Sequence, residues 1–409
     1  MTWLELALLS AVATSSAPTL GASTAEAKPP AAASVEAEGA AADVPDDPEI
    51  GERVDAESAE LEEMRALEES AMRPAPKVDE GVLRAVRRLG VAHPTRQRLS
   101  DALEELEPGG DFALSELPRV TDLEALDMVR LRGRFDIPVE MQPLVAQYIQ
   151  FFQGPGRKWF RKWMGRSTRY LPVMAPILES HQMPIDTVYL AMIESGFAPH
   201  AYSHAKAAGP WQFIPSTGKM YGLKEDFWVD ERRDPLKSTG AAAKYLTQLR
   251  QEFGDWYLAW AGYNAGSGKV RRVMQKKGST NFWELAEGKG FAKETQHYVP
   301  KLIACAIVAK NYKAFGFNDE EFEFLPALAY DEVKLTDATD LEVIAQSAGV
   351  TVDEVKELNP ELKRWCTPPA SEKLPYVLKL PAGSSAKFTE GFARIPARER
   401  LSFRVHRVK

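Results

Sequence analysis

Hydrophobic residues recur every three or four positions through the middle of the chain, where strand-like alternation is absent. This spacing predicts α-helices, and proline, glycine and small polar residues mark their ends. Ser238 or Thr239 is the expected cap of one helix, with Gly254 as its stop, and Asp255 is the expected cap of the next. The predicted helices cover residues 168–181, 184–195, 239–253, 256–263, a segment after 268, and 295–312. The pattern therefore indicates an all-α domain over residues 166–320.

The segments on either side of this domain have different patterns. Residues 81–165 are interpreted as a helical extension, whose part 139–164 is expected to pack on the next domain. In residues 325–383, short strands at 333–335 and 376–380 enclose helices at 341–348 and 352–358, a β-α-α-β order. Residues 384–409 are interpreted as a tail with a strand-like end at 401–408. The predicted fold is mainly α with a small β-α-α-β module.

Charge is distributed unevenly along the chain. Residues 1–80 hold 18 acidic and 5 basic side chains, whereas the remainder holds 40 acidic and 46 basic ones. An acidic N-terminal part on a mildly basic body suits a body that meets an anionic polymer. Residues 28–80 are rich in Ala, Glu, Asp and Pro, which predicts a disordered linker or a fraying helix around residues 57–69.

The first 27 residues are interpreted as a signal peptide. An apolar stretch contains Glu5, and Ala25-Glu26-Ala27 has the small-residue pattern of a cleavage site, although no basic residue precedes Lys28. No segment reaches the roughly 18 apolar residues of a membrane span. The region contains no cysteine for lipid attachment. We therefore expect an exported protein and leave peripheral membrane association open.

Metal, phosphate and nucleic-acid sites are not indicated. Cys305 lies on an apolar helix face and is expected to be a buried thiol, and a disulfide with Cys366 is left open. The basic face around Arg271 and Arg272 lacks the interleaved aromatic residues of a nucleic-acid surface. The histidines do not have metal-ligand spacing either. No metal, cofactor or nucleic-acid partner is expected.

Glu194 breaks a local rule of helix construction. It falls in the last turn of the predicted helix 184–195, where the helix dipole disfavours negative charge, and Gly196 follows as a stop. An apolar setting and this end of the dipole both raise a carboxyl pKa, as a general acid near neutral pH requires. A solvated Glu at a helix end explains the segment equally well.

Three more segments pair a turn or small residue with a polar side chain. They are residues 209–212 with Trp211 and Gln212, residues 261–266 with Tyr263 and Asn264, and residues 295–300 with Tyr298. Flat aromatic rings stack on sugar rings, and Trp211 in a turn is the better candidate for this. Trp256 and Trp260, at helical spacing, are expected in the core.

Together these segments resemble the catalytic domain of lytic murein transglycosylases of the membrane-bound D type, in the lysozyme-like superfamily. Residues 325–383 resemble a degenerate LysM module, through Leu341, Asn359-Pro360 and residues 380–383, and the strand at 401–408 resembles the start of a further repeat. The chain departs from the family pattern at Pro210 and Gly262, where Leu and Ala are common. The resemblance implies that Glu194 is the catalytic acid and base, with substrate-binding residues Ser195, Trp211, Gln212, Tyr263, Asn264 and Tyr298.

The implied reaction needs one carboxylate, whereas a hydrolase of the usual kind needs two. The resemblance implies cleavage of the β-1,4 bond between N-acetylmuramic acid and N-acetylglucosamine in peptidoglycan, which leaves 1,6-anhydro-muramyl ends. A goose-type-lysozyme-like muramidase and a non-catalytic peptidoglycan-binding protein are the alternatives. Asp234, which precedes Pro235, more plausibly opens a helix than acts as a second carboxylate. The others considered for that role are Asp226, Asp230, Glu231 and Glu284.

We expect a monomer in the periplasm or cell envelope, with outer-membrane association left open.

Overall fold

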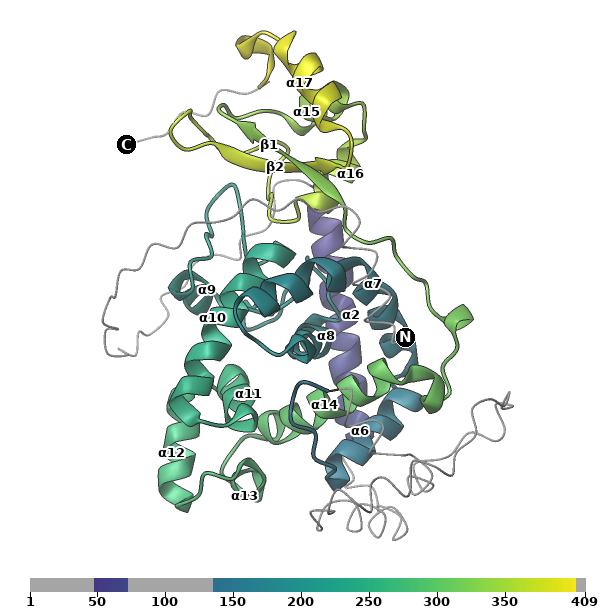
Figure 1. The fold of residues 1–409 in the computed structure, drawn as a ribbon, viewed down its shortest axis with the longest axis vertical. Coiled ribbons are helices and arrows are strands. Elements are labelled where there is room, and N and C mark those ends of the chain that lie inside the picture. The colour runs from purple at the N-terminus through teal and green to yellow at the C-terminus, as the bar shows by residue number, and fades with distance from the viewer. Residues whose placement is uncertain (1–47, 73–134, 402–409) are drawn as a thin grey trace.

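A helical domain and a smaller α/β module make up the chain in a computed structural model, which describes residues 48–72 and 135–401 (Figure 1). Short 3-10 turns at Ile185–Val188, Tyr312–Phe315 and Asp319–Glu321 join the helices. Outside the described residues lie the predicted signal peptide (1–27), residues 28–47 and 73–80 of the predicted linker, residues 81–134 of the predicted extension, and all but the first residue of the predicted strand at 401–408. The helices of the larger domain are α6 (Pro143–Gln153), α7 (Arg157–Ser180), α8 (Tyr189–Ser195), α9 (Pro215–Met220), α10 (Pro235–Phe253), α11 (Trp256–Ala265), α12 (Ser267–Lys277), α13 (Phe282–Ala286) and α14 (Lys293–Lys310).

Helix α14 lies at the centre of this domain. Its residues from Tyr298 to Ala309 are buried except for the partly exposed Lys301, and it packs against α6, α8 and α11. Cys305 is completely buried and free, which confirms the expected buried thiol. Trp260 of α11 is also completely buried, as predicted for the core. The fixed position of α14 matters because its first turns carry side chains of the candidate site.

The caps of two helices were predictable to different degrees. Asp255 accepts the backbone N–H of Leu258, so the predicted cap of α11 is confirmed. Asp234 accepts two backbone N–H groups at the start of α10, which confirms its helix-opening role. The prediction that Ser238 or Thr239 caps this helix is wrong, because both hydroxyls donate to carbonyls one turn earlier. An Asp before proline outcompetes these hydroxyls as the cap.

The smaller module has the predicted β-α-α-β order. Strand β1 (Tyr330–Leu335) pairs antiparallel with β2 (Tyr376–Pro381), and α15 (Leu341–Ala348) and α16 (Val352–Leu358) lie between them in sequence. A further helix, α17 (Ser385–Ala393), packs on α15 and buries Phe388. The interpretation of residues from 384 onwards as a tail is therefore wrong over α17, since the module needs this helix to cover its core.

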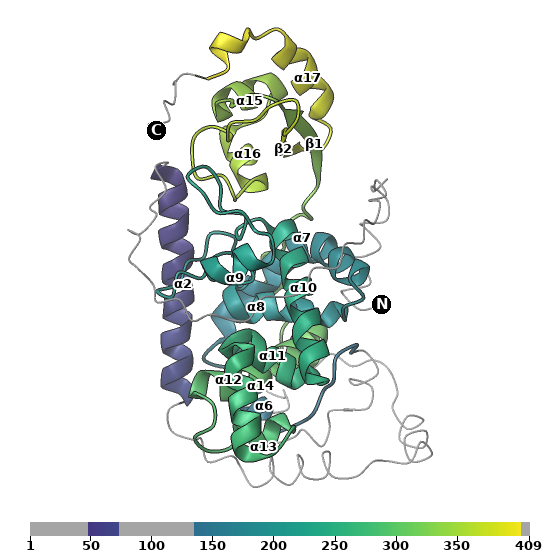
Figure 2. The same cartoon turned by 90° about the vertical axis from the view of Figure 1, so that its left-hand side faces the viewer.

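Helix α2 (Pro48–Met72) lies along one side of the molecule and reaches from the small module to the far end of the helical domain (Figure 2). The predicted disordered linker is wrong over these residues, whereas the alternative prediction of a helix around residues 57–69 is confirmed, and the helix is longer than predicted. Leu61 and Met64 join the core of the helical domain. Composition alone could not show this, because the helix contributes few apolar residues and depends on cations of the body, described below. None of the described helices is both long and apolar enough to cross a membrane.

A buried ion cluster joins the module to the helical domain. Lys379 Nζ of β2 lies 2.7 Å from Asp234 Oδ2 and 3.6 Å from Glu361 Oε1, and both carboxylates are completely buried. The backbone N–H of Asp230 also donates to the Glu361 carbonyl at 2.8 Å. One carboxylate thus caps a helix of the larger domain and binds a lysine of the smaller one, which fixes their relative position.

Lys379→Ala should destabilise the protein strongly, because two buried carboxylates would lose their shared cation. The expected loss is about 3–5 kcal/mol in the free energy of unfolding, measured by denaturant titration. Lys334→Ala, at an exposed position of β1, is the control and should change it by about 0.5 kcal/mol or less. Equal small effects of both substitutions would contradict a structural role for the cluster.

Candidate active site

Glu194 lies in the last turn of α8, as the sequence predicts. The helix ends at Gly196, whose φ of 61° is left-handed. A Cβ atom at Gly196 would lie 2.0 Å from the Trp163 ring, so no larger residue fits without displacing that indole. The tight packing of this turn against α7 fixes the backbone next to the Glu194 carboxyl.

The Glu194 carboxyl is held by one neutral donor in a largely desolvated setting. The Tyr298 hydroxyl of α14 donates to Glu194 Oε1 at 2.5 Å. Desolvation raises the pKa of Glu194, while the Tyr298 hydrogen bond and the charges of Arg65 and Lys301 oppose the rise. The side chain is nevertheless partly exposed. A carboxyl with a raised pKa that still reaches solvent can donate a proton to a ligand.

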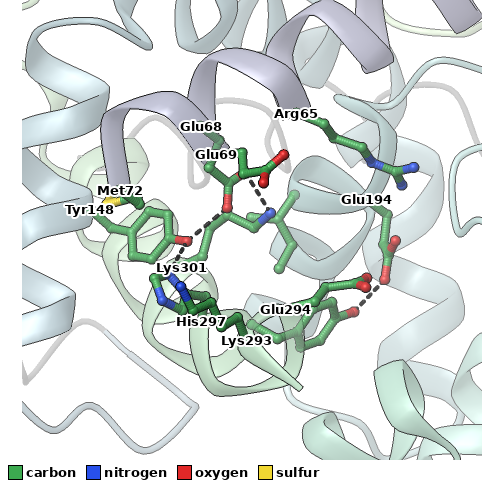
Figure 3. A pocket seen from close by; sticks show the side chains of 12 residues that line it. Arg65, Glu68, Glu69, Met72, Tyr148, Glu194, Lys293, Glu294, His297 and Lys301 are labelled. Atoms are coloured by element: carbon green, nitrogen blue, oxygen red, sulfur yellow. Dashed lines mark hydrogen bonds and ion pairs between the residues drawn. The ribbon is translucent and has the colours of Figure 1, made fainter. Parts of the chain in front are cut away.

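A cavity of about 460 Å³ adjoins this carboxyl (Figure 3). Three elements of the helical domain and the N-terminal helix α2 supply its walls. The lining residues are Arg65, Glu68, Glu69 and Met72 of α2, Tyr148 of α6, Ile193 and Glu194 of α8, and Lys293, Glu294, His297, Tyr298 and Lys301 of α14.

The turn at residues 209–212 has a strained and specific geometry. Gly209 has a φ of 78°, and a Cβ there would lie 2.0 Å from the Arg232 carbonyl oxygen. Gln212 has a φ of 48°, which non-glycine residues rarely adopt. Its Nε2 donates to the carbonyls of Gly209 at 3.0 Å and Ala201 at 3.2 Å, while its Oε1 is buried without a hydrogen-bond partner among the described residues. An unsatisfied buried acceptor calls for a ligand or water.

A buried arginine, Arg232, stabilises the turn at residues 209–212 through hydrogen bonds to neighbouring backbone carbonyls. Arg232 forms a bidentate pair with Asp230, with Nε–Oδ1 and Nη2–Oδ2 distances of 2.8 Å. Its Nη1 donates to the carbonyls of Lys206 and Phe213. Charge-assisted fork contacts of this kind fix backbone geometry well. Asp230 is therefore structural.

Three predicted site residues hold the turn and α14 in place. The Ser195 hydroxyl donates to the Pro210 carbonyl at 3.0 Å, and the Tyr263 hydroxyl donates to the Trp211 carbonyl at 2.8 Å. Asn264 Nδ2 donates to Glu294 Oε1 at 3.0 Å, and its Oδ1 accepts from Thr295. The donor proton of Ser195 is thus used within the protein, so we assign this buried residue a positioning role in place of the expected substrate contact.

Trp211 does not have the expected role. It is completely buried, and its indole N–H donates to Thr239 Oγ1 at 2.9 Å. A ring enclosed on both faces offers no surface to a sugar, so the prediction of a stacking platform is wrong. The turn that carries Trp211 directs its backbone carbonyl to Tyr263 and its ring into the core.

The remaining carboxylates considered in the sequence have structural partners outside the cavity. Asp226 accepts backbone N–H groups of Trp228 and Val229, Glu231 pairs with Lys237, and Glu284 accepts from Ser279. Sequence reasoning missed the carboxylates that do line the cavity, Glu68, Glu69 and Glu294. Glu294 lies next to the motif of Tyr298 and could have been found there, whereas nothing in the pattern pointed to α2.

The described residues contain no group of three or more His, Cys, Asp or Glu side chains arranged to hold a metal ion.

An all-α domain with a desolvated carboxyl at a helix end beside a cavity is the class that this fold and site define. Residues 179–286 match the family model of the transglycosylase SLT domain, and residues 329–397 match that of the LysM-like domain of lytic transglycosylase MltD. The chain therefore contains an SLT-type transglycosylase domain followed by an MltD-type LysM-like domain.

Individual relatives agree with this assignment. Membrane-bound lytic murein transglycosylase D of Escherichia coli K12 is 38% identical over 203 residues, which are 48% of this chain and 44% of that protein. The match therefore spans less than half of that relative. A protein of Alteromonas sp. strain M-1 whose name refers to tributyltin chloride resistance is 32% identical over 157 residues, 37% of this chain and 74% of its own length. The solved 70 kDa soluble lytic transglycosylase of Escherichia coli is 18% identical and covers 66% of this chain and 47% of its own, with a TM-score of 0.33, too low to add weight.

Tyr298→Phe should raise the pKa of Glu194 further, because the hydroxyl stabilises the charged carboxylate and would be lost. A ¹³C titration of the Glu194 carboxyl by NMR measures this directly in wild type and variant. Tyr312→Phe, which removes a tyrosine hydrogen bond to Asp319 outside the cavity, is the control and should leave the Glu194 titration unchanged. A lower or unaltered pKa in Tyr298→Phe would contradict the assigned hydrogen bond.

Proposed function

We propose that this chain is a peptidoglycan lytic transglycosylase. It cleaves the β-1,4 bond between N-acetylmuramic acid and N-acetylglucosamine and leaves 1,6-anhydro-muramyl ends. The observation that carries the proposal is the Glu194 carboxyl, desolvated, hydrogen-bonded by Tyr298 and open to a cavity of about 460 Å³. The match of residues 179–286 to the transglycosylase SLT domain supports the same reaction.

In the proposed mechanism Glu194 acts first as an acid and then as a base. Its proton passes to the glycosidic oxygen as the C1–O bond breaks, and the N-acetyl group of the muramic acid supports the cationic centre. Glu194 then takes the proton of the C6 hydroxyl while O6 bonds to C1. The protein ends in its starting protonation state and no water is consumed. A raised pKa suits the first step, since the carboxyl must hold a proton near neutral pH.

Gln212 is proposed to bind the substrate's N-acetyl group. Its Oε1 has no partner among the described residues and its Nε2 is already committed to two carbonyls, so the side chain presents a fixed acceptor. An amide N–H of the substrate would satisfy that acceptor. Tyr263 supports this contact indirectly by holding the Trp211 carbonyl, and Asn264 by holding Glu294.

A hydrolase is the second candidate, favoured by one observation. Glu294 lines the same cavity and its charge contributes to the raised pKa of Glu194, so a second carboxylate is close to the first. Such a residue could activate water, as in a muramidase. The hydrogen bond from Asn264 to Glu294 gives the carboxylate a positioning role instead, which favours the lyase.

The cellular setting follows from the substrate. We propose that the protein acts as a monomer on peptidoglycan strands in the periplasm or cell envelope, with the LysM-like module as a second glycan contact. The relatives named membrane-bound lytic murein transglycosylases support an envelope location. Outer-membrane association is an open extension of the same proposal.

Glu194→Gln should lower the rate of digestion of purified sacculi by about 10²–10⁴-fold, because general acid–base catalysis contributes about that much. Release of soluble muropeptides measures the rate, and mass spectrometry identifies their ends. Glu284→Gln, an exposed carboxylate outside the cavity, is the control and should retain wild-type rate. Anhydro ends are expected from wild type. Reducing ends would support the muramidase, and undiminished digestion by Glu194→Gln would remove Glu194 from its role.

A further inference from the structure

Helix α2 is part of the wall of the candidate active site. It contributes four of the cavity-lining residues, and the cavity remains open beside Glu194, so α2 borders this space without filling it. None of the sequence motifs of the catalytic domain includes this helix. A segment that forms one side of a catalytic cavity can contact what binds there.

Ion pairs hold α2 at two points, one on each side of Arg65. Glu60 accepts two hydrogen bonds from Arg166, at 2.9 and 3.0 Å, and one from Lys162 at 3.0 Å. Glu68 accepts from Lys301 at 3.0 Å and from the Tyr148 hydroxyl at 2.7 Å. These pairs are partly buried, so they resist screening by salt better than surface pairs. The segment of α2 between Glu60 and Glu68 is therefore held in place beside the cavity.

Arg65 is the cation on this segment of α2. Helix α2 carries nine carboxylates and two arginines, and the other one, Arg53, pairs with Asp353 of the small module. Figure 3 shows Arg65 reaching from α2 towards the side of the cavity where Glu194 lies. Its side chain is exposed and makes no hydrogen bond or ion pair among the described residues. Its charge acts on Glu194, whose pKa desolvation raises and Arg65 helps to lower.

We propose that Arg65 is a specificity-determining residue that binds a carboxylate of the stem peptide on the strand being cleaved. This proposal rests on the proposed function. The muramic acid next to the cleaved bond carries the stem peptide, whose free carboxylates lie beyond the sugar backbone. When the stem is removed at its amide bond, the muramic acid keeps only the carboxylate of its own lactyl group. A guanidinium is the donor best suited to a carboxylate because it offers a planar, bidentate fork. The protein would then prefer glycan strands that still carry their peptides.

The test compares peptide-bearing strands with strands in which the lactyl carboxylate of the muramic acid replaces the stem. Soluble peptide-bearing glycan strands are digested in parallel with the same strands after an amidase has removed the peptides, and anhydro ends are counted by mass spectrometry. Arg65→Ala should raise KM for peptide-bearing strands about tenfold, the range expected for one lost charged hydrogen bond, and change KM for bare strands less than twofold. Arg65→Lys should restore part of the preference. Arg271→Ala, at an exposed position of α12 outside the cavity, should behave as wild type on both substrates.

Other outcomes overturn the proposal. An equal effect of Arg65→Ala on both substrates would show that Arg65 does not bind a carboxylate of the stem peptide and acts instead through Glu194 or on the lactyl carboxylate. Failure of wild type to form anhydro ends from either substrate would instead contradict the proposed function, so the two failures are distinguishable.

A second variant tests whether α2 contributes to substrate binding or blocks access to the cavity. Glu60→Ala combined with Glu68→Ala removes both anchors, and circular dichroism and thermal unfolding check that the body stays folded. The double variant should lose the preference for peptide-bearing strands in the same way as Arg65→Ala. Faster digestion of both substrates would mean that α2 obstructs the cleft. An unchanged preference for peptide-bearing strands would mean that α2 does not contribute to substrate recognition. Either result would overturn the proposal.

Discussion

Desolvation of a single carboxyl is the constraint on which the rest of the site depends. Glu194 stands where the helix dipole and an apolar surrounding both disfavour its charge, and the protein offers it one hydroxyl and no direct cation. A buried lysine or arginine at this point would stabilise the anion and remove the proton that an acid needs. The Tyr298 hydroxyl instead bonds the carboxyl in either protonation state. It therefore orients the group while changing its pKa less than a salt bridge would.

The backbone around Glu194 is rigid because strong charged contacts have been placed elsewhere. The Asp230–Arg232 pair holds the turn of Gln212 from outside the cavity, and the Lys379 cluster fixes the start of α10. Buried pairs are costly in isolation but specify geometry when their remaining hydrogen-bonding groups are satisfied. The strained φ of Gln212 persists because these contacts over-determine the turn. Direct ion pairs thus fix the geometry at a distance, whereas the printed partner of the Glu194 carboxyl is a neutral hydroxyl and the charges of the cavity act on it without an ion pair.

Local rules in the sequence predict the parts of this protein that are locally determined. Glu194 was identifiable because it violates a helix-end preference, and Asp234 because an Asp before proline opens a helix. The β-α-α-β order of the module also follows from periodicity. Trp211 was misjudged because a turn was equated with the surface, whereas its ring is enclosed by the core that the turn closes. For α2 the sequence predicted only a fraying helix around residues 57–69 as an alternative to disorder, because the stability of the full helix comes from cations more than a hundred positions away in sequence, such as Arg166 and Lys301.

The rigid arrangement of the module has a consequence for glycan binding. Lys379 fixes the module from one side, and α2 bridges the two domains through Glu49–Lys356 at 2.5 Å and Arg53–Asp353 at 3.0 Å. A flexibly tethered binding module raises the local concentration of any strand within reach, whereas a fixed one helps only strands that span a set distance and direction. If the protein has the proposed function, the fixed distance and direction from module to cavity would therefore select glycan strands by their length and by the course they follow over the surface. The same helix that sets this geometry carries Arg65 into the cavity, so one element couples the placement of the strand to the recognition of its peptide.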